Sequence, residues 1–434
     1  MSIYILQFFV LLFCLFPFKL NAENYPYRSD VLWVTVPDNN NWLYNVGEDA
    51  KVDIQVFHYG IAIDNIKLYY EIGDDMMEAD THGSVLLKKG CATINLGSKK
   101  SPGFRDCRMT INLNGELYKH HVKVGFSPEL LKPYTKLPND FAEFWKKNIE
   151  YASKCPMKYT KKYVPEFSTD NVDYYLIRLQ SYAPGNYIYG YLSQPKKEGK
   201  YPVVLCPPGA GVKTIKEPQK HIFYAENNCI RLEIDIHGLN PEIPAENFSE
   251  ISSAFGDYLT FGIDSKDTYY MKKVYMGCIR AIDFLTTLPN WDGKNVIVQG
   301  GSQGGALALI TAGLDNRVTA CVANHPALSD MSGYKMNRAG GYPHFFKKYV
   351  EIDTPNKINT LFYYDVVNFA RFIKVPVFMT WGFNDDVCPP TTSYIVYNIL
   401  KCQKEALITP INEHWVSDKT EHKQLNWILE HLIK

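Results

Sequence analysis

One serine lies in a setting that could make it a nucleophile. Residues 300–304 read Gly-Gly-Ser-Gln-Gly, which fits the pattern G-x-S-x-G around Ser302. The apolar run 296–298 before it predicts a buried strand, and the apolar segment 306–312 after it predicts a packed helix. A serine on a tight turn between a strand and a helix exposes its hydroxyl to a base. Because the bare pattern often arises by chance, the flanking elements carry this prediction; the alternative is a glycine-rich turn with an uninvolved serine.

A serine nucleophile needs a base, and the base needs an orienting acid. The α/β-hydrolase fold supplies them in the order serine, acid, histidine, each in a loop at the end of a strand. Asp385 follows the apolar segment 375–381, and His414 follows the segment 406–410. We expect His414 to take the proton of Ser302 and return it to the leaving alcohol, while Asp385 holds the imidazole in the right tautomer. The alternative for His414 is a surface histidine in a loop.

Asp386 is the neighbour of Asp385 and lies in the same loop. Adjacent side chains on an extended loop point to opposite sides, so only one of the two can face the imidazole. If neither acts, Asp418 is the next carboxylate by position.

An esterase of this kind also needs two backbone N–H groups that stabilise the oxyanion. The residue after the nucleophile, Gln303, is expected to supply one of them. The other should come from the loop 207–211, Pro-Pro-Gly-Ala-Gly, which follows the apolar segment 203–206. We expect Ala210 to be this donor, because proline has no N–H and glycines let the backbone approach the substrate. The alternative is a plain turn.

The chain around these residues alternates strand and helix from about residue 172. Short apolar segments predict the strands, and longer ones such as 269–288 predict helices between them. This alternation predicts an α/β sheet with its active site at the carboxyl ends of the strands, and hence an α/β-hydrolase fold.

Residues 31–128 have a different pattern. Short segments with period-two alternation are separated by turn residues, among them the hairpin signal Asn114-Gly115. Six or seven such strands in about a hundred residues predict an immunoglobulin-like β-sandwich. We expect a sandwich domain at 23–128 and a catalytic domain at 129–434. The sandwich would space the catalytic domain, cover it or shape the site entrance; glycan binding has no support in its residues.

Residues 1–22 resemble a secretory signal peptide. The segment 5–18 is almost entirely apolar, and Leu20-Asn21-Ala22 provides a small-residue cleavage site. The expected location is therefore secreted or periplasmic. The segment lacks Lys and Arg before its apolar run, and the alternative is an uncleaved membrane anchor.

Charge and cysteine usage exclude several function classes. Lys plus Arg and Asp plus Glu each number 46, without a long basic run, so nucleic acid and anionic membranes are poor partners. The cysteines beyond residue 22 are odd in number and form no C-x-x-C pair, so we expect no zinc or other metal site. Cys91 and Cys107 are the only cysteines of the predicted sandwich, and we predict a disulfide between them in exported protein.

Three segments together resemble the acetyl xylan esterase/cephalosporin C deacetylase family, carbohydrate esterase family seven. They are Gly-Gly-Ser-Gln-Gly-Gly at 300–305, the segment 267–275, and Gly-x-x-Asp-x-x-Cys-Pro-Pro at 382–390. The likeness extends from about residue 140 to the end of the chain. It implies that Ser302, Asp385 and His414 form the catalytic triad, with Asp386 at a variable position. It also implies an oxyanion hole from Gln303 and Ala210, a preference for acetyl esters, and no metal or cofactor.

Two departures from the family pattern concern the substrate. His237-Gly238-Leu239 stands where the family has Arg-Gly-Gln, and Trp415 follows His414 where the family has Glu. The N-terminal sandwich is also an addition to the family pattern. These three differences leave the substrate preference and the oligomeric state open. The leading interpretation is a serine esterase that hydrolyses acetyl esters of xylan-type or other oligosaccharides through an acyl-enzyme. The alternatives are a broader carboxylesterase, a peptidase of the same fold, or an inactive glycan-binding protein.

Overall fold

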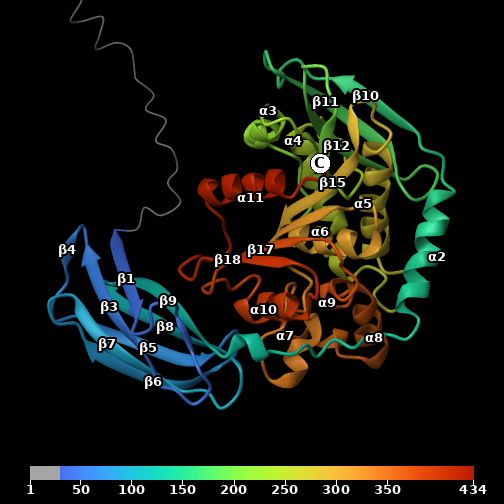
Figure 1. The fold of residues 1–434 in the computed structure, drawn as a ribbon. Helices are drawn as coiled ribbons and strands as arrows, with labels where there is room; N and C mark the ends of the chain where they lie inside the picture. The colour runs from blue at the N-terminus through green and yellow to red at the C-terminus, as the bar shows by residue number, and fades with distance from the viewer. Residues whose placement is uncertain (1–29) are drawn as a thin grey trace, which may run out of the picture.

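The computed structural model describes residues 30–434, which form two sheets in the N-terminal part and one large sheet in the rest (Figure 1). The predicted signal segment 1–22 lies outside the described residues. Within 30–434, no helix combines the length and apolar character that crossing a membrane would require.

The N-terminal part is a β-sandwich with its own core. Inward-facing residues such as Val52, Ile54 and Val56 alternate with exposed ones and are fully buried. One sheet consists of β1 (Val31–Pro37), β3 (Ala50–His58), β4 (Ile61–Ala62) and β7 (Cys91–Gly97). The other consists, in spatial order, of β2 (Leu43–Tyr44), β9 (Glu116–Phe126), β8 (Gly103–Leu113), β5 (Lys67–Asp74) and β6 (Ala79–Leu86).

The predicted disulfide between Cys91 and Cys107 is wrong for this structure. All nine cysteines in the described part of the chain are free. Cys91 begins β7 on the exposed side of one sheet, whereas Cys107 points from β8 into the buried core of the sandwich. The two side chains therefore belong to opposite sides of a packed layer.

The C-terminal part is built on a nine-stranded sheet, as the alternating pattern predicts. Its strands from β14 to β18 are parallel, and the strands at the other edge are antiparallel. In spatial order they are β10 (Tyr159–Tyr163), β11 (Val172–Gln180), β12 (Tyr187–Pro195), β14 (Ile230–Ile234), β13 (Tyr201–Cys206), β15 (Trp291–Gly301), β16 (Ala320–Asn324), β17 (Val377–Trp381) and β18 (Lys404–Ile408).

Helices cover both faces of this sheet because its central strands are apolar on both sides. Val296 and Val298 face a core shared with α5 and α6, while Ile297 faces a second core shared with α3 and α11. The α-helices are α2 (Phe141–Ser153), α3 (Phe223–Glu226), α4 (Ala245–Phe255), α5 (Met271–Leu285), α6 (Gln303–Leu314), α7 (Phe345–Lys348), α8 (Pro355–Tyr364), α9 (Val366–Ala370), α10 (Pro390–Ile399) and α11 (Asp418–Glu430). Short 3₁₀ turns are η1 (Pro128–Leu130), η2 (Pro218–His221), η3 (Tyr258–Thr260), η4 (Met331–Met336) and η5 (Val350–Ile352).

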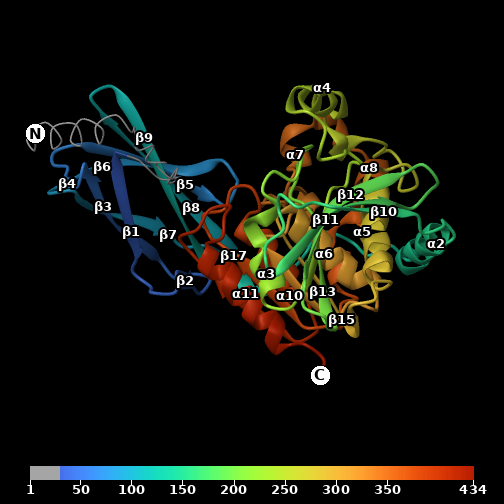
Figure 2. The ribbon, with the colours of Figure 1, turned by 90° about the horizontal axis from the view of Figure 1, so that it is seen from above.

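The sandwich packs against the C-terminal part through β8 and β9 (Figure 2). None of the first six residues of β9 is fully buried, but its last five residues are all buried, because the larger part covers their outer side. Phe104 of β8 packs its ring against Phe383 and Tyr394, with ring centroids 5.0 and 5.6 Å away. The sandwich is thus joined to the segment that precedes and begins α10, where Asp385 lies.

Candidate active site

Ser302 lies on the sharp turn between β15 and α6. Its φ is 58° and its ψ is −123°, a strained conformation for a residue with a side chain. The turn is tight because its neighbours lack side chains: a Cβ on Gly300 would lie 2.5 Å from the backbone of Gly304, and one on Gly304 would lie 2.4 Å from Pro207 O. The glycines of the motif thus allow the close strand-to-helix approach that lifts the serine hydroxyl off the sheet.

The structure brings Ser302, His414 and Asp385 together from three loops. Ser302 Oγ lies 3.0 Å from His414 Nε2, and His414 Nδ1 lies 2.8 Å from Asp385 Oδ2. Asp385 is fully buried, and its other oxygen accepts the backbone N–H groups of Val387 and Cys388, both at 2.8 Å. Every oxygen of this carboxylate is therefore hydrogen-bonded, as a buried charge requires. Asp418 instead begins α11.

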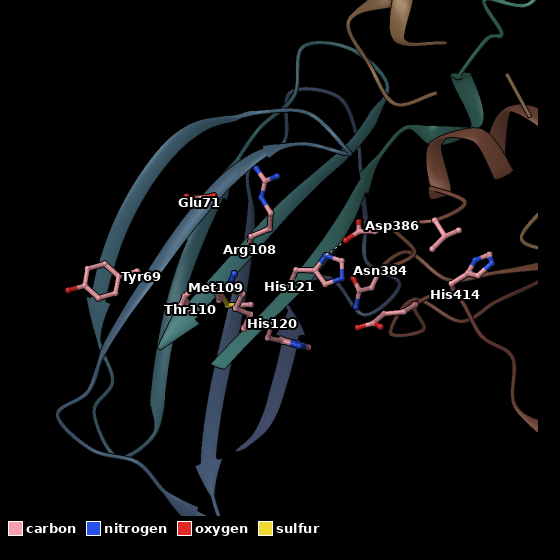
Figure 3. A pocket seen from close by; sticks show the side chains of 13 residues that line it. Tyr69, Glu71, Arg108, Met109, Thr110, His120, His121, Asn384, Asp386 and His414 are labelled. Atoms are coloured by element: carbon pink, nitrogen blue, oxygen red, sulfur yellow. Dashed lines mark ion pairs between the residues drawn. The ribbon is translucent and has the colours of Figure 1, made fainter. Parts of the chain in front are cut away.

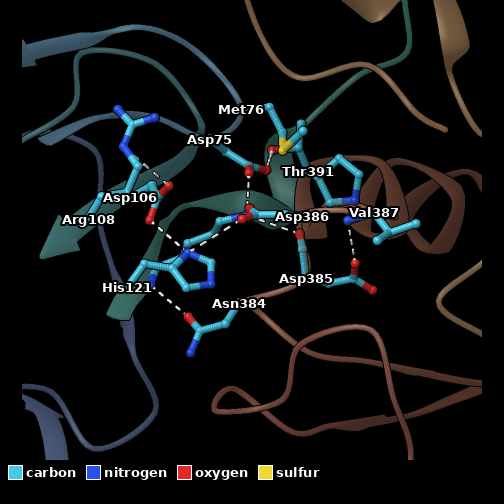
Figure 4. Close-up of polar contacts among 12 residues, drawn as sticks. Asp75, Met76, Asp106, Arg108, His121, Asn384, Asp385, Asp386, Val387 and Thr391 are labelled. Carbon is cyan, nitrogen blue, oxygen red and sulfur yellow. Dashed lines mark hydrogen bonds and ion pairs between the residues drawn. The ribbon is translucent and has the colours of Figure 1, made fainter. Parts of the chain in front are cut away.

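Asp386 points toward His121 and the other sandwich residues (Figure 4). Its Oδ1 accepts a hydrogen bond from Nζ of Lys123, at 2.5 Å. The same ammonium donates to the backbone carbonyl of Asp385 at 3.0 Å and lies 2.9 Å from Asp75 Oδ1. Asp75 in turn accepts the hydroxyl of Thr391 at 2.6 Å. A single cation from β9 thus holds the loop that presents Asp385.

Lys123 is fully buried, and its charge depends on these neighbours. Burial by itself would lower the pKa of this amine, but the carboxylates of Asp75, Asp106 and Asp386 outweigh burial and raise it. Burial likewise opposes ionisation of Asp386, yet Lys123 and His121 lower the pKa of that carboxyl below its usual value. Both partners are therefore charged at neutral pH. Lys123 also pairs with the buried Asp75, whereas the side chain of Asp386 is 58% exposed, so removing Lys123 is costly mainly through Asp75.

The same loop has two further supports. The backbone N–H of Lys123 donates to Asn384 Oδ1 at 2.9 Å, and Asn384 Nδ2 donates to the carbonyl of Ile411 at 3.3 Å, on the loop of His414. From the other side, His344 Nε2 lies 3.0 Å from the carbonyl of Val387, and its Nδ1 lies 2.8 Å from the hydroxyl of Tyr334. Burial lowers the pKa of His344 to about 4, so the ring is neutral at pH 7. The acid loop, residues 382–389 between β17 and α10, is therefore held by hydrogen bonds to the sandwich on one side and, through His344, to η4 on the other.

The two predicted oxyanion donors lie on neighbouring loops. Gln303 is the first residue of α6, so its N–H has no carbonyl acceptor within the helix. Ala210 lies in the loop after β13, where Tyr258 ties the two segments together. The Tyr258 hydroxyl donates to Gln303 Oε1 at 2.6 Å and accepts the N–H of Gly211 at 3.2 Å.

His237, the departure from the family pattern, lies behind this loop. Its Nε2 is 3.3 Å from the carbonyl of Gly211, and its Nδ1 is 2.7 Å from the hydroxyl of Tyr270. Burial lowers the pKa of His237 to about 4, so a neutral imidazole supports the loop here. Asp235, two residues earlier, accepts the backbone N–H groups of residues 237–239 and fixes their turn.

Two groups of His and Asp side chains within 30–434 are close enough to ligate a metal ion. The first is His414, Asp385 and His325, whose ring lies 4.3 Å from that of His414 by centroids. Burial lowers the pKa of His325 to about 4, so this ring is a neutral neighbour of His414. The second group is Asp106, His121 and Asp386, and the ammonium of Lys123 already pairs with Asp386 there. Hydrogen bonds and ion pairs thus occupy the carboxylates that a cation would need.

Several of these supporting residues escaped the sequence analysis. Lys123 falls on the outer face of a predicted strand, where solvent is the default neighbour, and nothing in its surroundings marks it as buried. Tyr258 lies in the 3₁₀ turn η3 between predicted elements. Among these residues, only His237 was marked in the sequence, because it stands where the family pattern has Arg.

Comparison with known proteins finds acetyl esterases and acetyl xylan esterases in sequence and in structure. A model of the family described as acetyl xylan esterase (AXE1) matches residues 129–431. The acetyl esterase Axe7A of Xylanibacter ruminicola is 60% identical over 410 residues, which cover 94% of this chain and 92% of that protein. The solved acetyl xylan esterase from Paenibacillus sp. R4 is 26% identical, with a TM-score of 0.62 over 70% of this chain and 98% of its own. Acetyl xylan esterase 1 from Thermoanaerobacterium sp. JW/SL YS485 shares the fold, at 21% identity and a TM-score of 0.60 over 70% of this chain and 98% of its own.

Proposed function

Since this chain belongs to the acetyl xylan esterase family and hydrolyses acetyl esters, we propose that Ser302, His414 and Asp385 perform this reaction on acetylated xylan-type oligosaccharides. One observation carries the assignment of the residues. A hydrogen-bonded path runs from Ser302 Oγ through the ring of His414 to the buried Asp385. This is the relay that a serine needs to become a nucleophile.

The acylation step follows from these positions. Ser302 Oγ attacks the acetyl carbonyl carbon while His414 Nε2 takes the hydroxyl proton. Asp385 stabilises the imidazolium that results and fixes its tautomer. When the tetrahedral intermediate collapses, the bond to the sugar oxygen breaks and His414 gives its proton to that oxygen. The products of this half are the free sugar alcohol and an acetyl ester on Ser302.

In the second half, a water molecule attacks the acetyl-enzyme. His414 accepts a proton from the water, and Ser302 leaves and regains a proton from the imidazolium, which releases acetate. In both halves the backbone N–H groups of Gln303 and Ala210 would stabilise the negative oxygen, and the link through Tyr258 supports their loops. No metal or cofactor takes part in this scheme.

The proposal includes the organisation of the chain. We assign residues 23–128 to the sandwich domain, of which the structure describes 30–128, and residues 129–434 to the catalytic domain. The family match at 129–431 and the separate core of the sandwich support this division. Export to the periplasm or the medium is proposed from residues 1–22 alone.

The test is Ser302→Ala, assayed with p-nitrophenyl acetate and with acetylated xylo-oligosaccharides. Loss of a triad serine in such enzymes lowers the rate by about 10⁴–10⁶-fold, and circular dichroism should show an unchanged fold. A variant that keeps a tenth of the wild-type rate on either substrate would rule out Ser302 as the nucleophile.

A further inference from the structure

A cleft of about 570 Å³ connects His414 with the outer face of the sandwich (Figure 3). Asn384, Asp386 and Glu413 line it on the catalytic side. On the other side it is lined by strands β5, β8 and β9. Figure 3 shows Tyr69 at the end of the cleft far from His414. The volume is within the range of about 300–1,000 Å³ that ligand sites commonly have.

The sandwich wall of the cleft is an ordered polar surface. Cross-strand partners form two rows across the sheet, which are Tyr69–Thr110–Lys119 and Glu71–Arg108–His121. Side chains of directly opposed residues lie about 5 Å apart, so each row is a continuous strip of hydroxyl, ring and charged groups. The second row ends at His121, whose Nδ1 is 3.9 Å from Asp386 Oδ2. The first row is open to solvent, with Tyr69 52% exposed.

Catalytic chemistry determines which half of a substrate meets this surface. The oxyanion donors Gln303 and Ala210 hold the acyl carbonyl, whereas His414 protonates the alcohol oxygen. The alcohol portion of the ester must therefore lie beside His414, where the cleft begins. For an acetylated oligosaccharide this portion is the sugar chain.

The charges of the cleft favour a neutral ligand. The acids Glu71 and Glu413 line it together with the cations Arg108 and Lys119, and the charge of Asp386 is matched by Lys123. Burial disfavours protonation of His121, but its hydrogen bond to Asp106 and the charges of Asp106 and Asp386 together outweigh burial and raise the pKa of this imidazole. A surface of mixed donors and acceptors without net charge suits a polyhydroxyl chain better than an anionic one.

We propose that the row Tyr69–Thr110–Lys119 binds the sugar chain of the substrate on the alcohol side of the ester, which makes the sandwich a substrate-binding part of the active site. The inference rests on the proposed function, because it assumes that the alcohol is an oligosaccharide. It predicts that kcat/KM rises with the length of an acetylated xylo-oligosaccharide, since a longer chain reaches more of the row.

The experiment compares two variants of the row with a matched tyrosine outside it. Tyr69→Ala removes a ring at the far end, and Thr110→Val removes one hydroxyl with little change of shape. Tyr59→Ala is the control, because Tyr59 is 72% exposed on the same domain and does not line the cleft. For each protein, kcat/KM is measured on an acetylated xylo-hexasaccharide, an acetylated xylo-disaccharide and p-nitrophenyl acetate.

Tyr69→Ala should lower the ratio of hexasaccharide to p-nitrophenyl acetate kcat/KM by about tenfold, the value of one aromatic contact. Thr110→Val should lower it less, and Tyr59→Ala should leave it at the wild-type value. The inference is overturned if both row variants keep the wild-type dependence on chain length, or if Tyr59→Ala loses it equally. Failure of the proposed function is distinguishable, because wild type would then cleave p-nitrophenyl acetate but no acetylated xylo-oligosaccharide of any length.

Discussion

The two halves of the active site are held in different ways. The turn of Ser302 is built by its own neighbours, because Gly300 and Gly304 allow β15, α6 and the loop at Pro207 to approach closely. The loop of Asp385 depends on a distant partner, since Lys123 contacts its backbone from a position 262 residues earlier in the chain. The proposed nucleophile is thus positioned by local sterics, and the proposed acid by a buried lysine of the other domain. Sequence motifs report the first kind of support and not the second.

The sharpest test of this contrast replaces the two neighbouring carboxylates separately. Asp385→Asn should lower kcat by about 10⁴-fold, because an amide favours the wrong tautomer of His414. Asp386→Asn should cost at most about tenfold, because Lys123 still donates to the carbonyl of Asp385. Steady-state kinetics on p-nitrophenyl acetate measures both. The opposite ranking would show that Asp386 is the acid, and two mild effects would place the acid elsewhere, with Asp418 next by position.

Replacing Lys123, the distant support of the Asp385 loop, should have the second-largest effect on kcat. Lys123→Met leaves the buried carboxyl of Asp75 and the exposed carboxylate of Asp386 without their cation. Because of the buried partner, this should lower stability by about 3–5 kcal/mol. A shift of the loop by about 1 Å should also lower kcat by roughly 10²-fold, with KM less affected. Kinetics at a temperature where the variant is folded, together with urea unfolding, separates the two effects.

Lys99→Met is the matched control for this variant. Lys99 is also a largely buried sandwich lysine and pairs with Asp74 at 2.5 Å, but it has no contact with the acid loop. It should lose stability while keeping kcat. Lys123→Arg should restore part of kcat, because it keeps the charge. Equal loss of kcat in the Lys99 and Lys123 variants would mean that Lys123 supports only the fold.

The smallest expected effect tests by pH the support that His344 gives to the loop of Asp385. His344 has a folded pKa of about 4 and an unfolded value near 6.5, so only the unfolded chain takes up its proton as pH falls from 6.5 to 4. Its contribution to stability is therefore lost in this window. In urea unfolding, the advantage of wild type over His344→Gln should shrink by roughly 2 kcal/mol between pH 7 and pH 5. A constant advantage of wild type over His344→Gln would contradict the neutral state of that ring.

The contrast also explains how far the sequence could predict the molecule. The period-two and helical patterns show which faces of the strands and helices are apolar. They were sufficient to predict the α/β-hydrolase fold, which is confirmed. The order of Ser302, Asp385 and His414 along the chain was sufficient to predict which loops meet, because the parallel strands end on one edge. Lys123 could not be predicted, since the pattern of β9 gives its outer face and not what covers that face. The Cys91–Cys107 pairing failed for a similar reason, because spacing alone does not say on which side of a strand a thiol lies.

The distance along the chain between Lys123 and the acid loop has a consequence for how the protein is made. The sandwich can bury its own core as soon as it is synthesised, because that core includes neither Phe104 nor Lys123. Both side chains contact residues that are synthesised more than 260 positions later, and contacts of such long sequence separation form late in folding. The sandwich is therefore synthesised first, and the loop of Asp385 packs against it later. Catalytic competence should appear in refolding only after the sandwich has recovered its structure.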